Sequence, residues 1–150
     1  MRIIDAYIHT NFNKEELARL ARINNIDFSL EGLEKEMKEN HVVKAVSITD
    51  HFELETPMAL EEIEQQSKNL SLIVPCVGIN PYKITKNSFV RLEKVIIGKK
   101  VKAIKIFLGY YPFYANAALY HPFYRLAGKY RIPVIFHTGD TMLKTAKLKY

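Results

Sequence analysis

Five short apolar runs, separated by helix-forming stretches, constrain the fold of this chain more than any other feature. The runs span residues 2–8, 42–48, 72–77, 101–107 and 133–137. Each is rich in isoleucine and valine and is apolar almost throughout, as expected for strands that are covered on both faces. Strands that are separated by helices must run parallel, with right-handed crossovers. The alternation therefore predicts an α/β fold built from (βα) units.

The intervening stretches carry the start and stop signals of amphipathic helices. Capping residues precede apolar residues at helical spacing, and a glycine or a first-turn proline marks some of the helix ends. The residues expected to begin or end these helices are Asn13, Ser29, Thr56 with Pro57, Asn87, Gly98, and Asn116 or the nearby Pro122. One helical stretch is thus predicted in every gap between two strands, and the first gap has room for two.

Two architectures fit this order of elements. One is an open doubly wound sheet, and the other is part of a (βα)8 TIM barrel. The chain has 150 residues, which is enough for one domain with a sizeable core, and we take residues 1–150 as a single domain. A complete barrel needs eight strands and typically about 250 residues, so five strands could form only part of one.

The net charge of +6 conceals an uneven distribution along the chain. Residues 1–75 carry a net charge of −6, whereas residues 76–150 carry +12. Three interpretations are open: an acidic face packs on a basic one, an acidic partner covers the basic half, or the basic half binds nucleic acid. Because the basic residues are scattered over several predicted elements, nucleic acid is the least favoured partner.

Composition narrows the setting in which the protein is expected to work. No apolar run approaches the roughly 20 residues of a membrane-spanning helix, and the first residues lack the layout of a signal peptide. Cys76 is the only cysteine, so an internal disulfide and a cysteine-cluster metal site are excluded. We therefore expect a cytoplasmic protein that acts on a small molecule and not on a membrane.

Polar residues collect where the predicted strands end, which is where parallel α/β folds bind their ligands. Strict alternation along the first strand would place Asp5, Tyr7 and His9 on one face. The fifth run similarly ends in His137. Two imidazoles at one barrel mouth could share a zinc ion, although a catalytic zinc usually takes three protein ligands and a water.

Three segments of the second half make a resemblance explicit. They read KAIKIFLGYYPFY at 102–114, LYHPFYRLA at 119–127 and IPVIFHTGD at 132–140. Together with the DAYIH of residues 5–9, they resemble the amidohydrolase superfamily, and more narrowly its amidohydrolase-related, TIM-barrel metal-dependent hydrolases. The resemblance extends over the whole chain and corresponds to the N-terminal part of such a barrel.

The resemblance implies a (βα)8 barrel with a mono- or binuclear metal centre, commonly zinc, whose activated water attacks an amide, an ester or a lactone. A sub-branch of the superfamily instead decarboxylates aromatic acids. By position, His9 and His137 match metal ligands of the first and fifth strands. Lys105 occupies the strand-4 position, where a carboxylated lysine bridges two metals in binuclear relatives.

The chain also departs from the family pattern. Tyr7 replaces the first histidine of the strand-1 motif, and a neutral phenol is a poor zinc ligand, so Tyr7 is a doubtful metal-binding residue. The strand-6 histidine and the strand-8 aspartate of the family have no counterpart. The metal could therefore have been lost.

Further roles at the strand ends remain open. Lys105 could be a carboxylated bridge, a contact for a substrate carboxylate, or a partner of an acidic neighbour such as Asp5 or Asp50. We assign Asp50, Tyr110 and Asp140 to the rim of the substrate site.

These observations predict a metal-dependent hydrolase of a small molecule. The alternatives are an aromatic-acid decarboxylase of the same superfamily and a non-catalytic half-barrel that acts as an interaction module. The half-barrel alone would expose the first and fifth strands as unpaired edges. They would need cover from a second copy or from the remaining half of a barrel.

Overall fold

The computed structural model describes residues 2–12, 14–49, 60–69 and 71–139, and it confirms the predicted alternation of strands and helices. The five strands are β1 (Ile3–Ile8), β2 (Val42–Ile48), β3 (Ile73–Ile79), β4 (Ala103–Ile106) and β5 (Val134–Phe136). The α-helices are α1 (Glu15–Ile23), α2 (Leu30–Glu39), α3 (Leu60–Gln66), α4 (Lys86–Ile97) and α5 (His121–Tyr130). Two 3₁₀ turns, η1 (Ser67–Asn69) and η2 (Ala118–Tyr120), complete the order.

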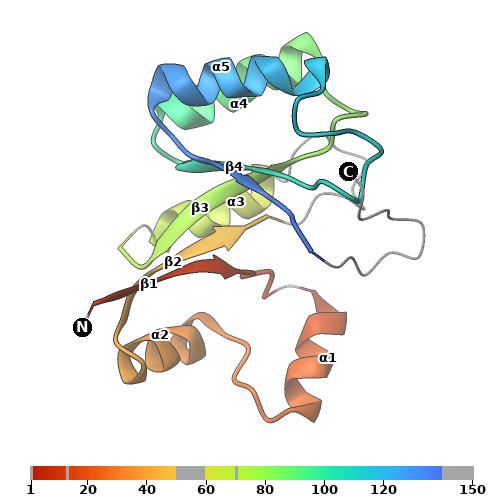
Figure 1. Cartoon of the computed structure of the whole chain (residues 1–150). Coiled ribbons are helices and arrows are strands. Elements are labelled where there is room, and N and C mark those ends of the chain that lie inside the picture. The colour runs from red at the N-terminus through yellow and green to blue at the C-terminus, as the bar shows by residue number, and fades with distance from the viewer. Residues whose placement is uncertain (1, 13, 50–59, 70, 140–150) are drawn as a thin grey trace.

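The strands form one parallel sheet in the order β1-β2-β3-β4-β5. Because each crossover steps to the next strand in the same direction, right-handed crossovers place all helices on the same face. A doubly wound sheet would instead reverse the strand order at one point. The sheet is curled into a half-barrel with its helices outside (Figure 1), as expected for the first five βα units of a barrel.

The helix-covered face of the sheet contains the larger of two apolar clusters. Outward-facing residues of β3 and β4 pack there against one side of α4 and of α5. The fully buried members of this outer cluster include Val77, Ile79, Leu92, Ile104, Ile106 and Phe123. This packing positions β3, β4 and β5 and leaves their inner faces to form the candidate site.

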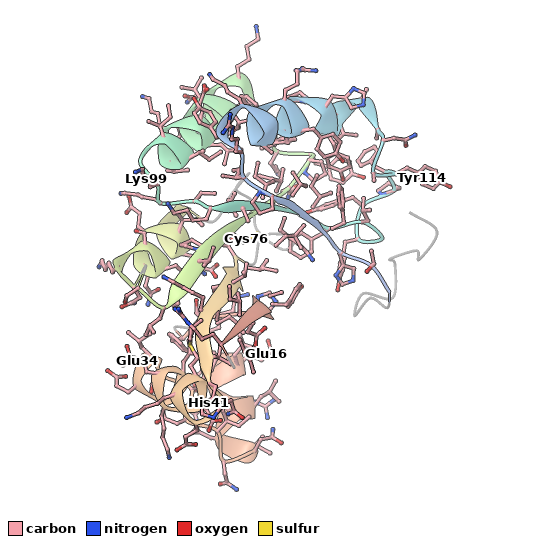
Figure 2. The ribbon with its side chains drawn as sticks, turned by 60° about the vertical axis from the view of Figure 1, so that its left-hand side comes forward. Glu16, Glu34, His41, Cys76, Lys99 and Tyr114 are labelled. Carbon is pink, nitrogen blue, oxygen red and sulfur yellow. The ribbon has the colours of Figure 1, made fainter. Side chains whose placement is uncertain are left out.

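The inner face of the sheet has a smaller core of its own. Ile48, Cys76, Ala103 and Phe107 are its buried members on or just after the strands, and Tyr111 packs on it from the loop after β4. No described helix covers this face (Figure 1). In Figure 2, Cys76 lies in the middle of the sheet.

The two ends of the half-barrel are readily located on its α4–α5 side. Lys99, just before β4, lies at one end of this side in Figure 2, and Tyr114, in the loop after β4, lies at the other. The end marked by Tyr114 is the carboxyl end of the strands, where ligands bind in parallel α/β folds.

A β-bulge in β1 corrects one prediction from the sequence. Asp5 pairs in register with Ala45 and lines the crevice beneath α2, so it faces the helices. The register shifts between Asp5 and Ile8, and Tyr7 then points to the inner face, where its ring meets Lys105. The bulge inserts an extra residue into the strand and thereby breaks the alternation that would have kept Asp5 and Tyr7 on one face.

Helix ends agree with the sequence signals in some places and differ in others. Ser29 caps α2 as predicted, its Oγ accepting a hydrogen bond from the amide of Gly32 at 3.0 Å. For α4, Thr85 is the cap and not Asn87, because Thr85 and Ser88 form a reciprocal capping box.

The other predicted helix ends have mixed outcomes. Gly98 does end α4, but the left-handed residue is the following Lys99, whose φ is 58°. Helix α5 begins near Pro122, in its first turn, and not at Asn116. The predicted capping residues Asn13 and Thr56 lie outside the described residues.

Candidate functional site

Lys105 lies at the centre of the inner face, although its side chain is charged. Lys105 is only 1% exposed to solvent. Its Nζ lies 4.6 Å from the ring centroid of Tyr7 and 5.3 Å from that of Phe107. In the register of β3 and β4 its neighbour is Gly78, which adds no side chain that would compete for this space. The ammonium group is therefore held between aromatic rings, whose faces attract cations.

Burial shapes the acid–base chemistry of this part of the face. Desolvation lowers the pKa of the Lys105 amine to about 8, and the nearby Cys76 thiol acts in the opposite direction. Burial raises the pKa of Cys76 itself to about 12, so this thiol stays neutral at physiological pH. At pH 7 Lys105 thus places a desolvated positive charge on the inner face.

No carboxylate among the described residues is within ion-pair distance of Lys105. Asp5, one of the two acidic partners considered from the sequence, lies on the other side of the sheet. Its Oδ1 accepts a hydrogen bond from the amide of Tyr7 at 3.0 Å. The pairing of Lys105 with Asp5 is therefore wrong, and Asp50, the other candidate, lies outside the described residues.

His9 stands at the end of β1 with one ring nitrogen fixed. Its Nδ1 lies 2.9 Å from the backbone oxygen of Ile48, at the end of β2. Because a carbonyl oxygen can only accept, Nδ1 must be the protonated nitrogen, and the neutral ring then carries its lone pair on Nε2. This arrangement orients metal-binding histidines in many proteins, where a second hydrogen bond fixes the tautomer.

His137 stands at the end of β5, and its ring is packed between aromatic side chains. Its backbone amide donates to the carbonyl of Ile106 at 2.9 Å, which continues the β4–β5 ladder. The imidazole stacks on Phe107 with 6.4 Å between ring centroids, and the edge contact with Tyr110 is closer, at 4.9 Å. Tyr110 therefore lies beside His137 at the carboxyl end of the sheet, where the sequence placed it.

A continuous series of side-chain contacts crosses the inner face from the first strand to the last. His9 makes an edge contact with Tyr7 at 5.4 Å, and Tyr7 lies under the ammonium of Lys105. Lys105 also lies over Phe107, whose ring stacks on His137. The structure thus brings four residues predicted from the sequence, Tyr7, His9, Lys105 and His137, into one network.

The network contains side chains of the type that bind a divalent metal, but fewer of them than a catalytic zinc usually has. Imidazole nitrogens are good zinc ligands, and His9 and His137 supply two of them. Within the part of the chain that the structure describes, no group of three or more histidine, cysteine or acidic side chains is close enough to hold a metal ion. The acidic rim candidates Asp50 and Asp140 lie outside that part.

Two further buried polar groups lie near this network, and the sequence did not single them out individually. Tyr111 is 6% exposed within the inner cluster, and its hydroxyl has no hydrogen-bond partner in the described residues, so burial raises its pKa to about 12. Thr49, just after β2, is fully buried and accepts a hydrogen bond from the amide of Gly78 at 2.9 Å. A polar residue directly after an apolar run was the available signal for Thr49, whereas nothing local distinguishes Tyr111 from the other tyrosines of its aromatic-rich loop.

Comparison of the chain with family models, with curated proteins and with solved structures gave no match. Among the described helices, none has the length and apolar character needed to cross a membrane.

Proposed function

We propose that this half-barrel belongs to a metal-dependent hydrolase of the amidohydrolase superfamily, acting on a small molecule in the cytoplasm. The observation that carries the proposal is the contact network from His9 through Lys105 to His137, on the inner face of the sheet and toward the strand ends. Polar and charged side chains on an otherwise apolar barrel interior are typical of an active site.

In this proposal His9 and His137 hold the metal, for which zinc is the expected ion. When bound, the metal supplies an activated water for attack on an amide, an ester or a lactone. The hydrogen bond from His9 Nδ1 to Ile48 fixes the tautomer whose lone pair is on Nε2, the nitrogen that would coordinate the metal. Tyr7 serves as an aromatic wall for Lys105 and not as a ligand.

Lys105 is assigned to substrate binding. With a pKa of about 8 its amine is mostly protonated at pH 7, and its desolvated charge would attract a carboxylate of the substrate. The buried hydroxyl of Tyr111 is a second group that a polar substrate atom could satisfy. The aromatic surroundings of His137 and Lys105 also suit an aromatic acid, which keeps the decarboxylase as the second candidate.

The test is the zinc content of the purified protein after dialysis against the metal. We expect bound zinc in the wild type, its loss in His9→Ala and in His137→Ala, and retention in the control His121→Ala, an exposed histidine at the start of α5. Tyr7→His should raise zinc affinity, because it restores a third imidazole to the inner face.

Two outcomes would contradict the assignment. Zinc binding that survives both alanine substitutions would show that other residues hold the metal. Absence of zinc from the wild type and from Tyr7→His would favour the non-catalytic half-barrel. With zinc present, product analysis on aryl amides, lactones and aromatic acids would separate hydrolysis from decarboxylation.

A further inference from the structure

The two outermost strands of the sheet, β1 and β5, each pair on one side only within the described chain. On β5, Pro133 accepts from the amide of Ile104, and His137 donates to Ile106. Because backbone groups alternate in direction along a strand, Val134 and Phe136 present their N–H and C=O groups to the open edge. Such an edge readily pairs with another strand.

Two large side chains of β1, Ile4 and Tyr7, are exposed on the inner face of the sheet. Ile4 pairs in register with Lys44, whose alternation with Val46 and Ile48 places it on the inner face. Ile4 is 63% exposed there, and Tyr7 is 44% exposed. A strand isoleucine that points into the barrel yet remains exposed lacks the neighbours that a closed barrel would supply.

We propose that a second copy of this chain covers both edges and the inner face. In this assembly β5 of each copy pairs with β1 of the other, around a two-fold axis that coincides with the barrel axis. All strands then run parallel, and the ten strands described in the two copies close into one barrel in which β1 and β5 are paired on both sides. Because barrel diameter grows with strand number, such a barrel encloses more space than an eight-stranded one.

The charges of the flanking helices support a second copy as the occupant. Helix α2, which packs beside β1 and β2, carries four glutamates and two lysines. Helix α5, which precedes β5, carries Arg125 and Lys129 and no acidic residue. Closure brings α5 of one copy toward α2 of the other, so that a basic helix approaches an acidic helix across each junction.

Closure would also change the candidate site, a consequence that rests on the proposed function. The partner's β1 would lie next to β5, so that the second copy's His9 would stand at the same barrel end as His137. Each junction would then supply two imidazoles from different chains, in addition to the pair within one chain. The assembly itself does not depend on metal, so its test is independent of the zinc measurement.

The experiment is sedimentation velocity of the purified chain over a wide range of protein concentrations, with a chelator present. We expect a species of twice the single-chain mass of 17.4 kDa that dissociates on dilution. Ile4→Lys, which places a charge on the closed inner face, and Phe136→Pro, which removes an edge donor of β5, should each raise the dissociation constant about tenfold or more.

The matched control is Ile97→Lys. Ile97 is the last residue of α4 and is 59% exposed, close to the value for Ile4, but it lies away from both edges. This variant should dimerise like the wild type, and circular dichroism should show that all variants are folded. A monomer at every concentration would overturn the proposal, as would polymers larger than a dimer.

The variants also distinguish other pairings of the edges. If Ile4→Lys weakens the dimer and folded Phe136→Pro does not, pairing between two copies of β1 would replace the proposed closure. If neither variant has an effect, association through the edge strands is wrong.

Discussion

At the scale of single residues, Lys105 shows how the sheet changes the chemistry of a side chain. Its position on β4 forces the amine among aromatic rings and away from water. Desolvation favours the neutral amine, and this is why its pKa falls from 10.5 to about 8. In the unfolded chain no such burial exists, so the pKa of the same group should return to its ordinary value.

This difference predicts a pH dependence of stability. Between about pH 8 and 10.5 the unfolded chain binds more protons at Lys105 than the folded one, so the contribution of Lys105 to the free energy of unfolding should rise with pH. The rise is limited to about 1.4 kcal/mol per pH unit. Urea unfolding of the wild type and of Lys105→Met at pH 7 to 9.5 measures the effect as the difference between the two proteins.

The Lys105→Met variant serves as the reference because other groups also titrate in this range. The buried Cys76 thiol, with its pKa raised to about 12, makes an opposite contribution above pH 9 in both proteins. The quantity to follow is the free energy of unfolding of the wild type minus that of Lys105→Met. If this difference stays constant or falls as the pH rises, the lowered pKa of Lys105 is wrong.

At the scale of elements, local signals decide where helices begin, and the cap of α2 is the clearest case. Ser29 Oγ accepts from the amide of Gly32 and donates to the Asp27 carboxylate at 2.7 Å. Without the serine hydroxyl, one amide in the first turn of α2 would lose its protein acceptor.

We therefore predict that Ser29→Ala lowers the free energy of unfolding by about 1 kcal/mol. Chemical denaturation with fluorescence or circular dichroism detection gives this value. The control is Ser71→Ala, at an exposed serine in the turn before β3, which should change stability by less than about 0.5 kcal/mol. Equal losses in both variants would mean that the cap is not the cause.

At the scale of the whole molecule, the two faces of the sheet contribute unequally to stability. The outer face is sealed by α4 and α5, whereas within the described residues the inner face is covered by its own side chains and by the loop after β4. The neighbouring strands β4 and β5 carry isoleucines on opposite faces: Ile104 is fully buried on the outer face, and Ile135 is half-buried on the inner one.

We expect Ile104→Ala to lower the free energy of unfolding by about 2–5 kcal/mol, because it leaves a cavity among side chains that cannot collapse. Ile135→Ala should cost clearly less, since part of that side chain is already in contact with solvent. Both values come from urea unfolding at protein concentrations where the wild type is monomeric. Similar losses for the two variants would indicate that the inner face is as well packed as the outer face.

Much of the fold could be predicted from the sequence because its signals are local. Continuous isoleucine- and valine-rich runs gave the strands, and the predicted run 42–48 is β2 to the residue. Helix starts were less accurate where two capping residues stood close together, as with Asn87 and Thr85. The choice between an open sheet and a half-barrel was not available locally, because it depends on the order in which strands pair.

For the candidate site, the sequence predicted which residues lie near the strand ends but not their geometry. His9, Lys105, Tyr110 and His137 were identified as strand-end residues, and the structure places them on or beside the inner face. Asp5 was placed wrongly because a bulge cannot be read from alternation alone. Tyr111 was not distinguished from the neighbouring Tyr110, because only packing decides which tyrosine of a cluster is buried.

The sequence by itself determined the type and order of the elements, since apolar periodicity and capping residues act over a few neighbouring positions. Tertiary structure alone decided which face each polar residue occupies, how far Lys105 is removed from water, and which strands lie at the two ends of the described sheet. These properties depend on contacts between residues far apart in the chain, such as Tyr7 with Lys105, and such contacts exist only once the sheet has curled.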